Sequence, residues 1–174
     1  MAKSVEKKGS QGAQILLVDN ERDFVEVYAD ILRAWGYTVT TTTSAAQAIQ
    51  LVGGADFDLV ITDIWMPGMN GIDLLKTLKQ MRSTLPVIVI TGYSSVQTAI
   101  QAMKAEAADY LTKSQFLKSE ARERIERTLM KREIGSKRKG KTDQNHRREE
   151  RLMRKLDRER HGCDVTSDAT VSCQ

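Results

Sequence analysis

Short apolar segments alternate with longer amphipathic ones along the chain. The segments at 15–18, 59–62 and 87–90 are dominated by Leu, Ile and Val, and polar residues bound each of them. Runs of this length are too short for a helix, so they predict strands that are buried on both faces of a sheet. The segments at 37–42 and 109–112 mix apolar residues with Thr, Asp and Tyr. We expect two further strands there, at the edges of the same sheet.

The segments between these strands carry apolar residues at helical spacing. The first such pattern stops at Gly36, as helices often do. Ser44 and Gln47 form a capping-box pattern before the second. A fifth helix is expected over 116–131, with its inward face formed by Ile125 and Leu129. The apolar positions that define the other four helices are Phe24, Val27, Tyr28, Ile31, Leu32 and Trp35; Ala45, Ala48, Ile49 and Val52; Ile72, Leu75 and Leu78; and Val96, Ala99, Ile100 and Met103.

Five strands that alternate with helices predict an α/β protein with a parallel sheet and helices on both faces. The more polar strands, the second and the fifth, are expected at the two edges. The strand order 2-1-3-4-5 of the flavodoxin-like doubly wound fold satisfies this arrangement. In such folds, ligands bind beyond the carboxyl ends of the strands, where the winding reverses between strands one and three.

Polar side chains gather at these carboxyl ends. Asp19 and Asn20 follow the first strand, and Asp63 ends the third. Thr91 follows the fourth strand and Lys113 the fifth. Two carboxylates beside an amide oxygen form a hard-oxygen site suited to Mg²⁺. A carboxylate between a metal and a lysine stays ionised and nucleophilic, and the same cations can neutralise an incoming phosphoryl group.

Each residue also has a plainer interpretation when it is taken alone. Asp19 could cap the helix that starts near Asp23. Thr91 with Gly92 could form only a turn, and Lys113 could be solvated like most lysines. Their joint position at four strand ends of one predicted sheet favours a shared site.

The chain resembles the receiver domain of two-component response regulators over residues 13–132. The matching motifs are ILLVDNE at 15–21, DLVITDIWMPGMNGIDLL at 58–75, PVIVITGYS at 86–94 and ADYLTK at 108–113.

This resemblance implies a role for each matching residue. Asp63 is the implied phosphoacceptor, and Asp19 with the backbone carbonyl of Trp65 helps to hold Mg²⁺. Lys113 contacts the phosphoryl group. Many receivers carry two acids after the first strand, whereas this chain has Asp19 followed by Asn20. Because Asn supplies an oxygen without charge, we expect Asn20 to lower the metal affinity.

The resemblance also implies a switch. Thr91 is the implied switch hydroxyl, and Tyr110 is the aromatic residue whose rotamer follows it. Pro commonly follows the lysine in this family, often across a cis bond, but Ser114 follows Lys113 here. A cis bond before a residue other than proline costs roughly 2.5 to 4 kcal/mol, which favours a trans bond and a changed aim of the lysine.

Length and charge describe the rest of the 174-residue chain. Residues 1–12 are small and polar and predict a flexible arm. From Ser114 onward, Lys and Arg number 17 against 11 acidic residues, whereas residues 1–113 hold 10 against 12. The net charge of +4 is therefore a property of the C-terminal part. Residues 133–174 predict a basic extension, disordered or partly helical, in which no output domain is recognisable.

Several function classes are disfavoured. No apolar run approaches the roughly 18 residues that span a bilayer, and no signal peptide is visible, so we expect a cytoplasmic protein without membrane contact. His161, Cys163 and Cys173 could be three zinc ligands, but a fourth is missing and solvated thiols are the alternative. A hydrolase is disfavoured because no general base is visible outside the acceptor site. We expect no enzyme activity beyond assistance to the protein's own aspartyl phosphorylation and dephosphorylation.

Two functions of different classes remain. The first is a receiver of a two-component phosphorelay, phosphorylated on Asp63 by a histidine kinase or a phosphotransfer protein. It would signal without an output domain, through contacts with a downstream protein or through a phosphorylation-dependent homodimer. The alternative is a nucleic-acid-binding effector that uses the basic 133–174 tail under receiver control.

Overall fold

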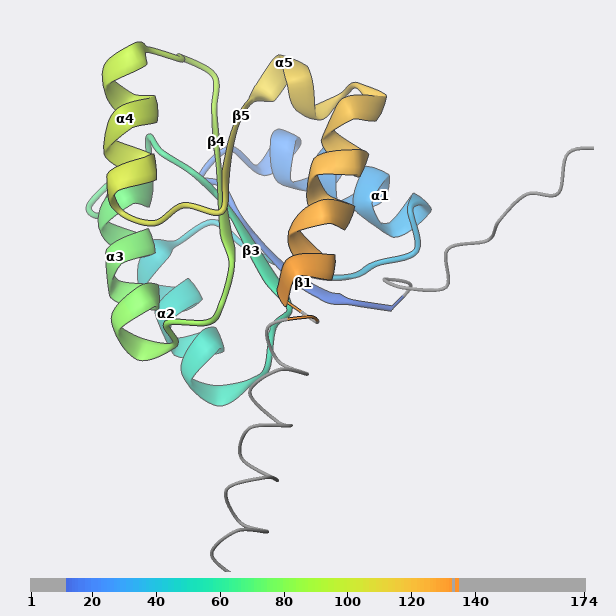
Figure 1. Ribbon diagram of the computed structural model, residues 1–174, viewed down its shortest axis with the longest axis horizontal. Helices are drawn as coiled ribbons and strands as arrows, with labels where there is room; N and C mark the ends of the chain where they lie inside the picture. The colour runs from blue at the N-terminus through green and yellow to red at the C-terminus, as the bar shows by residue number, and fades with distance from the viewer. Residues whose placement is uncertain (1–11, 133, 135–174) are drawn as a thin grey trace, which may run out of the picture. The chain divides into compact units, whose positions relative to one another are not determined.

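One parallel sheet of five strands forms the centre of the fold (Figure 1). The computed structural model describes residues 12–132 and 134. The spatial order β2-β1-β3-β4-β5 confirms the predicted flavodoxin-like topology, with the winding reversing between β1 and β3. The strands are β1 (Gln14–Val18), β2 (Thr38–Thr42), β3 (Leu59–Asp63), β4 (Val87–Thr91) and β5 (Asp109–Thr112).

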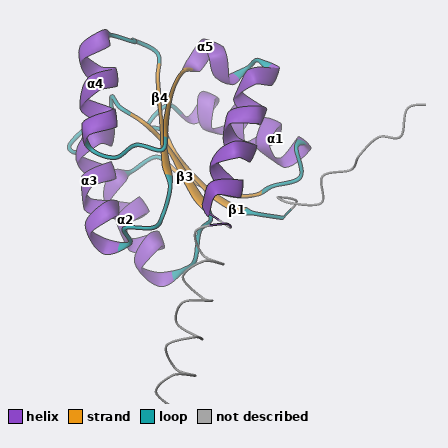
Figure 2. Cartoon of the chain, in the orientation of Figure 1, coloured by secondary structure: helices purple, strands orange, loops and turns teal. Residues whose placement is uncertain are grey.

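Helices cover both faces of the sheet (Figure 2). None of them, within the residues that the structure describes, is long and apolar enough to cross a membrane. A further helical segment follows over 119–132. The other helices are α1 (Arg22–Ala34), α2 (Ala45–Gly54), α3 (Gly71–Met81), α4 (Val96–Lys104) and α5 (Lys113–Phe116).

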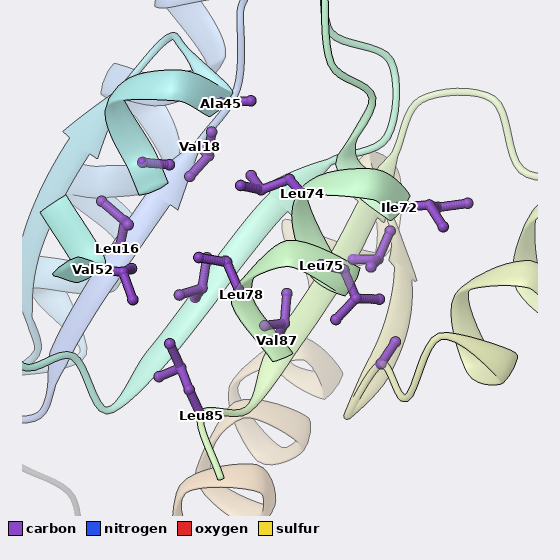
Figure 3. Packing of buried hydrophobic residues seen from close by; sticks show 14 of the residues in the cluster. Leu16, Val18, Ala45, Val52, Ile72, Leu74, Leu75, Leu78, Leu85 and Val87 are labelled. Carbon is purple, nitrogen blue, oxygen red and sulfur yellow. The ribbon is translucent and has the colours of Figure 1, made fainter. Parts of the chain in front are cut away.

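Two hydrophobic clusters, one on each face, hold these layers together. Because successive strand residues point to opposite faces, Leu16 and Val18 of β1 belong to one cluster, and Ile15 and Leu17 to the other. The first cluster packs the strands against α2, α3 and α4, and Figure 3 shows side chains of α2 and α3 lying over the strands. The second packs them against α1, α5 and the 119–132 helix. Burial on both faces explains why the central strands are uniformly apolar.

The start of α3 lies unusually close to the end of β3. A side chain at Gly71 would place its Cβ 1.9 Å from the carbonyl oxygen of Asp63, so only glycine fits there. The N–H of Gly71 donates a 2.8 Å hydrogen bond to the carbonyl of Ile64. Asn70 caps α3, and its side chain accepts hydrogen bonds from two backbone N–H groups. This packing fixes the loop that follows Asp63.

The predicted starts and stops of the first two helices are largely confirmed. Gly36 has φ of +92° and follows the C-cap of α1, a conformation that favours glycine. Ser44 caps α2 by accepting from the N–H of Gln47. The predicted capping box is incomplete, because the side chain of Gln47 instead accepts a 2.6 Å hydrogen bond from Thr42.

The predicted apolar faces of α1 and α4 are partly wrong. Val27 is 51% exposed and Phe24 is only partly covered, whereas the buried positions of α1 include Val25 and Ala29. In α4 only Ala102 is buried. Its predicted apolar positions Val96, Ile100 and Met103 are exposed, Val96 to 79%. Helical spacing identifies an apolar stripe, but packing against the sheet decides which side of the helix is covered.

The predicted fifth helix is divided in two. The short α5 begins directly after β5, and residues 117 and 118 separate it from the 119–132 helix. Ile125 and Leu129 are buried as predicted. Two ion pairs hold this helix in place: Arg124 with Asp109 of β5, and Arg132 with Asp58, which directly precedes β3. The expected arm over 1–12, apart from its last residue, and the expected tail over 133–174, apart from residue 134, lie outside the described residues, as do the three candidate zinc ligands.

Candidate functional site

Asp63 is the last residue of β3 and lies at the carboxyl edge of the sheet, between β1 and β4. The residue is only 3% exposed, and its Oδ1 accepts a 2.7 Å hydrogen bond from the N–H of Ile64. Burial raises the pKa of the Asp63 carboxyl above its usual value, and the nearby Asp19 carboxylate raises it further. The ionised form of the Asp63 carboxyl therefore needs nearby cations to stabilise it.

Asp19 and Asn20 follow β1, which is the neighbour of β3. Asp19 is fully buried, and its Oδ1 accepts a 3.0 Å hydrogen bond from the N–H of Glu21. Asp19 does not cap α1, because the N-cap is Glu21 and no side chain makes a capping bond there. Asn20 Oδ1 is buried without a hydrogen bond. A buried acceptor left in this way is typical of a site that a ligand completes.

Lys113 reaches this edge from the start of α5 and joins the carboxylates. Its Nζ lies 2.9 Å from Asp19 Oδ2, 3.3 Å from Asp63 Oδ2 and 2.9 Å from Glu21 Oε1. Burial by itself lowers the pKa of Lys113, but the hydrogen bonds to Asp19 and Glu21 outweigh it, so the pKa lies above the usual value. The interpretation of Lys113 as a solvated lysine is therefore wrong. The peptide bond to Ser114 is trans, as are all peptide bonds of the described residues.

Thr91 ends β4, Trp65 lies in the loop after β3, and Tyr110 lies in β5. Thr91 is fully buried at the end of β4, and its hydroxyl exchanges hydrogen bonds of 3.2 and 3.3 Å with the backbone of Tyr93. These hydrogen bonds form the turn at Thr91 and Gly92 that the plainer interpretation of Thr91 predicted. Trp65, two residues after Asp63, is 56% exposed. The hydroxyl of Tyr110 lies 2.9 Å from the hydroxyl of Thr98, at the first turn of α4.

The arrangement is matched by a known domain family. The family model of the response regulator receiver domain matches residues 15–126 of the chain. The match includes both central carboxylates and the lysine. The chain belongs to the response regulator receiver domain family.

Among curated relatives, this receiver is similar to the transcriptional regulatory protein ZraR of Escherichia coli (strain K12). The two are 42% identical over 99 residues, which cover 57% of this chain and 22% of ZraR. The chain therefore spans less than a quarter of the length of that relative. The similarity is confined to these 99 residues, and the rest of ZraR is not matched by this chain.

Solved receiver structures have the same fold. The response regulator TrrA from Thermotoga maritima, in complex with Mg²⁺ and BeF, is 28% identical with a TM-score of 0.62. That comparison covers 67% of this chain and 98% of TrrA. The beryllofluoride-activated NtrC4 receiver domain dimer is also 28% identical with a TM-score of 0.62, over 68% of this chain and 98% of that one.

Glu21 is the residue of this receiver's site that sequence reasoning missed. Carboxylate oxygens of Asp19, Glu21 and Asp63 all lie within 4.8 Å of one another. Three carboxylates face one lysine, so the cluster carries a net negative charge that suits a divalent cation. The position of Glu21 in the motif DNE at 19–21 was the available signal in the sequence. However, a side chain two residues after the end of a strand need not point back toward that end. The donor set of Asp19, Asn20, Glu21 and Asp63 fits Mg²⁺ in ligand type.

Proposed function

We propose that this receiver takes up a phosphoryl group on Asp63 from a histidine kinase or a phosphotransfer protein. One observation carries the proposal: Lys113 Nζ lies between the buried carboxylates of Asp19 and Asp63, at 2.9 and 3.3 Å. The family match and the likeness to a receiver that binds Mg²⁺ and BeF support it.

The transfer itself needs little beyond positioning and charge. A carboxylate oxygen of Asp63 attacks the phosphorus atom, and the bond from phosphorus to the donor breaks, with its electron pair leaving on the donor. Lys113 is placed to neutralise charge on the phosphoryl oxygens. Asp19 and Asp63, with the amide oxygen of Asn20 and the backbone carbonyl of Trp65, would hold Mg²⁺, which would supply further positive charge there. Water later hydrolyses the acyl phosphate, which releases inorganic phosphate and restores the Asp63 carboxylate.

The signal leaves the site, we propose, through Thr91 and Tyr110. Thr91 offers a hydroxyl to a phosphoryl oxygen once its hydrogen bonds to the turn are released. The hydrogen bond between Tyr110 and Thr98 supports a link from the strand β5 to the helix α4. The exposed side chains of Val96 and Ile100 make the surface of α4 suited to a downstream protein or to a second copy of the receiver. The dimer of the NtrC4 receiver supports the second of these.

The test of the proposal is phosphoryl uptake. The protein is incubated with acetyl phosphate with and without Mg²⁺, and its intact mass is measured. We expect a gain of one phosphoryl group that needs both Mg²⁺ and Asp63. Asp63→Asn should take up none, whereas the matched control Asp30→Asn, which removes a carboxylate that is 78% exposed, should behave as the wild type. A phosphoryl group on the Asp63→Asn protein would contradict the assignment.

The alternative function, nucleic-acid binding through the 133–174 tail, falls on residues outside the described part. It stays a prediction, as do the cytoplasmic location and the absence of an output domain.

A further inference from the structure

Tyr28 links α1 to the backbone of Lys113 across 85 residues of sequence. The ring of Tyr28 is almost fully buried, and its hydroxyl donates a 3.3 Å hydrogen bond to the carbonyl oxygen of Lys113. The ring is held between Phe24 and Phe116, with centroid separations of 5.6 and 4.6 Å. The hydroxyl therefore has a fixed position from which to hold that carbonyl.

Phe24 contacts the other end of the same lysine. Lys113 Nζ lies 4.2 Å from the centroid of the Phe24 ring. A cation at this distance is attracted to the face of an aromatic ring. Phe24 therefore contacts Lys113 although Phe24 is 36% exposed. One helix thus holds both the carbonyl and the ammonium group of Lys113.

The surroundings of Lys113 show why such support is useful. Lys113 is the first residue of a four-residue helix, which Thr112 caps through the N–H of Gln115. The next residue is Ser114, which leaves the backbone freer than a proline would. A lysine has a long side chain with many rotamers, so its ammonium group is placed well only if other groups restrict it. Among the described residues, the side chain of Lys113 makes no ion pair, hydrogen bond or ring contact with another side chain of α5.

We propose that Tyr28 and Phe24 are positioning residues that aim Lys113 at the phosphoryl group. The proposal rests on the proposed function of Asp63. Burial raises the pKa of the Tyr28 hydroxyl to about 12, so it remains a hydrogen-bond donor at neutral pH. Neither residue touches the reacting atoms, and both act through Lys113.

A double-mutant cycle tests this role. Tyr28→Phe removes the hydroxyl and keeps the ring, and the rate of uptake from acetyl phosphate with Mg²⁺ is measured by intact mass. We expect the rate to fall by about threefold to tenfold, as for the loss of one hydrogen bond. In a Lys113→Met background the same substitution should have no effect, because the residue through which it acts is absent. Phe24→Leu should slow the wild type by about twofold to fivefold and likewise lose its effect in that background.

Two further measurements separate this role from a structural one. Val27→Ala, on the exposed side of α1, should leave the rate unchanged, so a loss there would point to the stability of α1 and overturn the proposal. The ¹⁵N resonance of the Lys113 ammonium group is recorded on the same proteins, and Tyr28→Phe should shift or broaden it.

The outcomes distinguish the two proposals. If the wild type takes up no phosphoryl group on Asp63, the proposed function fails, and the Lys113 resonance still decides whether Tyr28 restrains the lysine. If uptake occurs but Tyr28→Phe matches the wild type, the positioning role is refuted. It is also refuted if Tyr28→Phe slows phosphoryl uptake by the same factor in the Lys113→Met background as in the wild type. An unchanged Lys113 resonance in Tyr28→Phe would refute it as well.

Discussion

Replacing Lys113 by methionine keeps much of the length of the side chain and removes its charge. The change leaves Asp19 and Asp63 buried beside each other with no cation among the described residues to replace the lysine. We expect the free energy of unfolding to fall without Mg²⁺, because an unpaired buried charge costs far more than an exposed one.

The size of this loss follows from the two short distances. At an effective dielectric constant of about 20, attraction over 2.9 Å amounts to about 6 kcal/mol and over 3.3 Å to about 5 kcal/mol. Dehydration of the buried lysine offsets much of this gain, and removal of one partner from buried pairs typically costs about 3 to 5 kcal/mol. We expect a loss in that range. The pair with Glu21, whose side chain is 54% exposed, adds little.

The loss should depend on pH. Burial and then Asp19 already raise the pKa of Asp63 in the folded protein, and Lys113 opposes them, so its removal raises that pKa further. A carboxyl group with a raised folded pKa binds more protons in the folded state than in the unfolded one. Its unfavourable contribution is therefore absent below the unfolded pKa, grows as the pH rises from there to the folded pKa, and is complete above the folded pKa. The difference in free energy of unfolding between Lys113→Met and the wild type should therefore narrow as the pH falls through the folded pKa that Asp63 has in the variant.

Urea unfolding followed by tryptophan fluorescence measures these free energies. The two proteins are compared at about pH 7.5 and about pH 5, with and without Mg²⁺. Mg²⁺ should restore part of the stability of the variant, because a bound cation again faces the carboxylates. Two results would refute the pairing of Lys113 with the buried carboxylates. One is a loss in free energy of unfolding below about 1 kcal/mol for Lys113→Met at the higher pH, and the other is a loss of equal size at both pH values.

Two more predictions concern the metal and the switch. Asn20→Asp adds a carboxylate to the site and should tighten Mg²⁺ binding by about fivefold to tenfold, measured by quenching of Trp65 fluorescence; an unchanged titration would show that Asn20 is not a ligand. Thr98→Val removes the partner of the Tyr110 hydroxyl and should enlarge the change in amide exchange that beryllofluoride causes in α4 and β5. Thr91→Ala should abolish that change, and equal responses in the two variants and the wild type would show that the signal takes another route.

The order of strands and the carboxyl-edge site were predictable from the sequence. Strands buried on both faces, such as 15–18 and 59–62, must be apolar throughout, and this leaves a signal that short windows detect. Once the sheet is parallel, Asp19 and Asp63 must lie at the same edge, because the carboxyl ends of its strands point in one direction. Topology alone therefore brings the two carboxylates together.

Helix faces were less predictable. The apolar stripe of α4 contains Val96 and Ile100, which spacing assigns to the core, yet both are exposed. A stripe of apolar residues is equally consistent with a face that covers the sheet and with one left for a partner. The difference depends on how α4 rotates against β4 and β5, and that rotation is decided by neighbours that are distant in the sequence.

The sequence by itself determined which groups gather at the ends of the parallel strands: two carboxylates, an amide oxygen and a lysine. Only the tertiary structure decided how Lys113 is held. Its contacts with Glu21 and Tyr28 join residues that are 92 and 85 positions apart. Periodicity and local motifs report how a residue lies within its own helix or strand. They carry no information on which side chain of another element reaches it, because that depends on the packing of α1 and α5 against one face of the sheet.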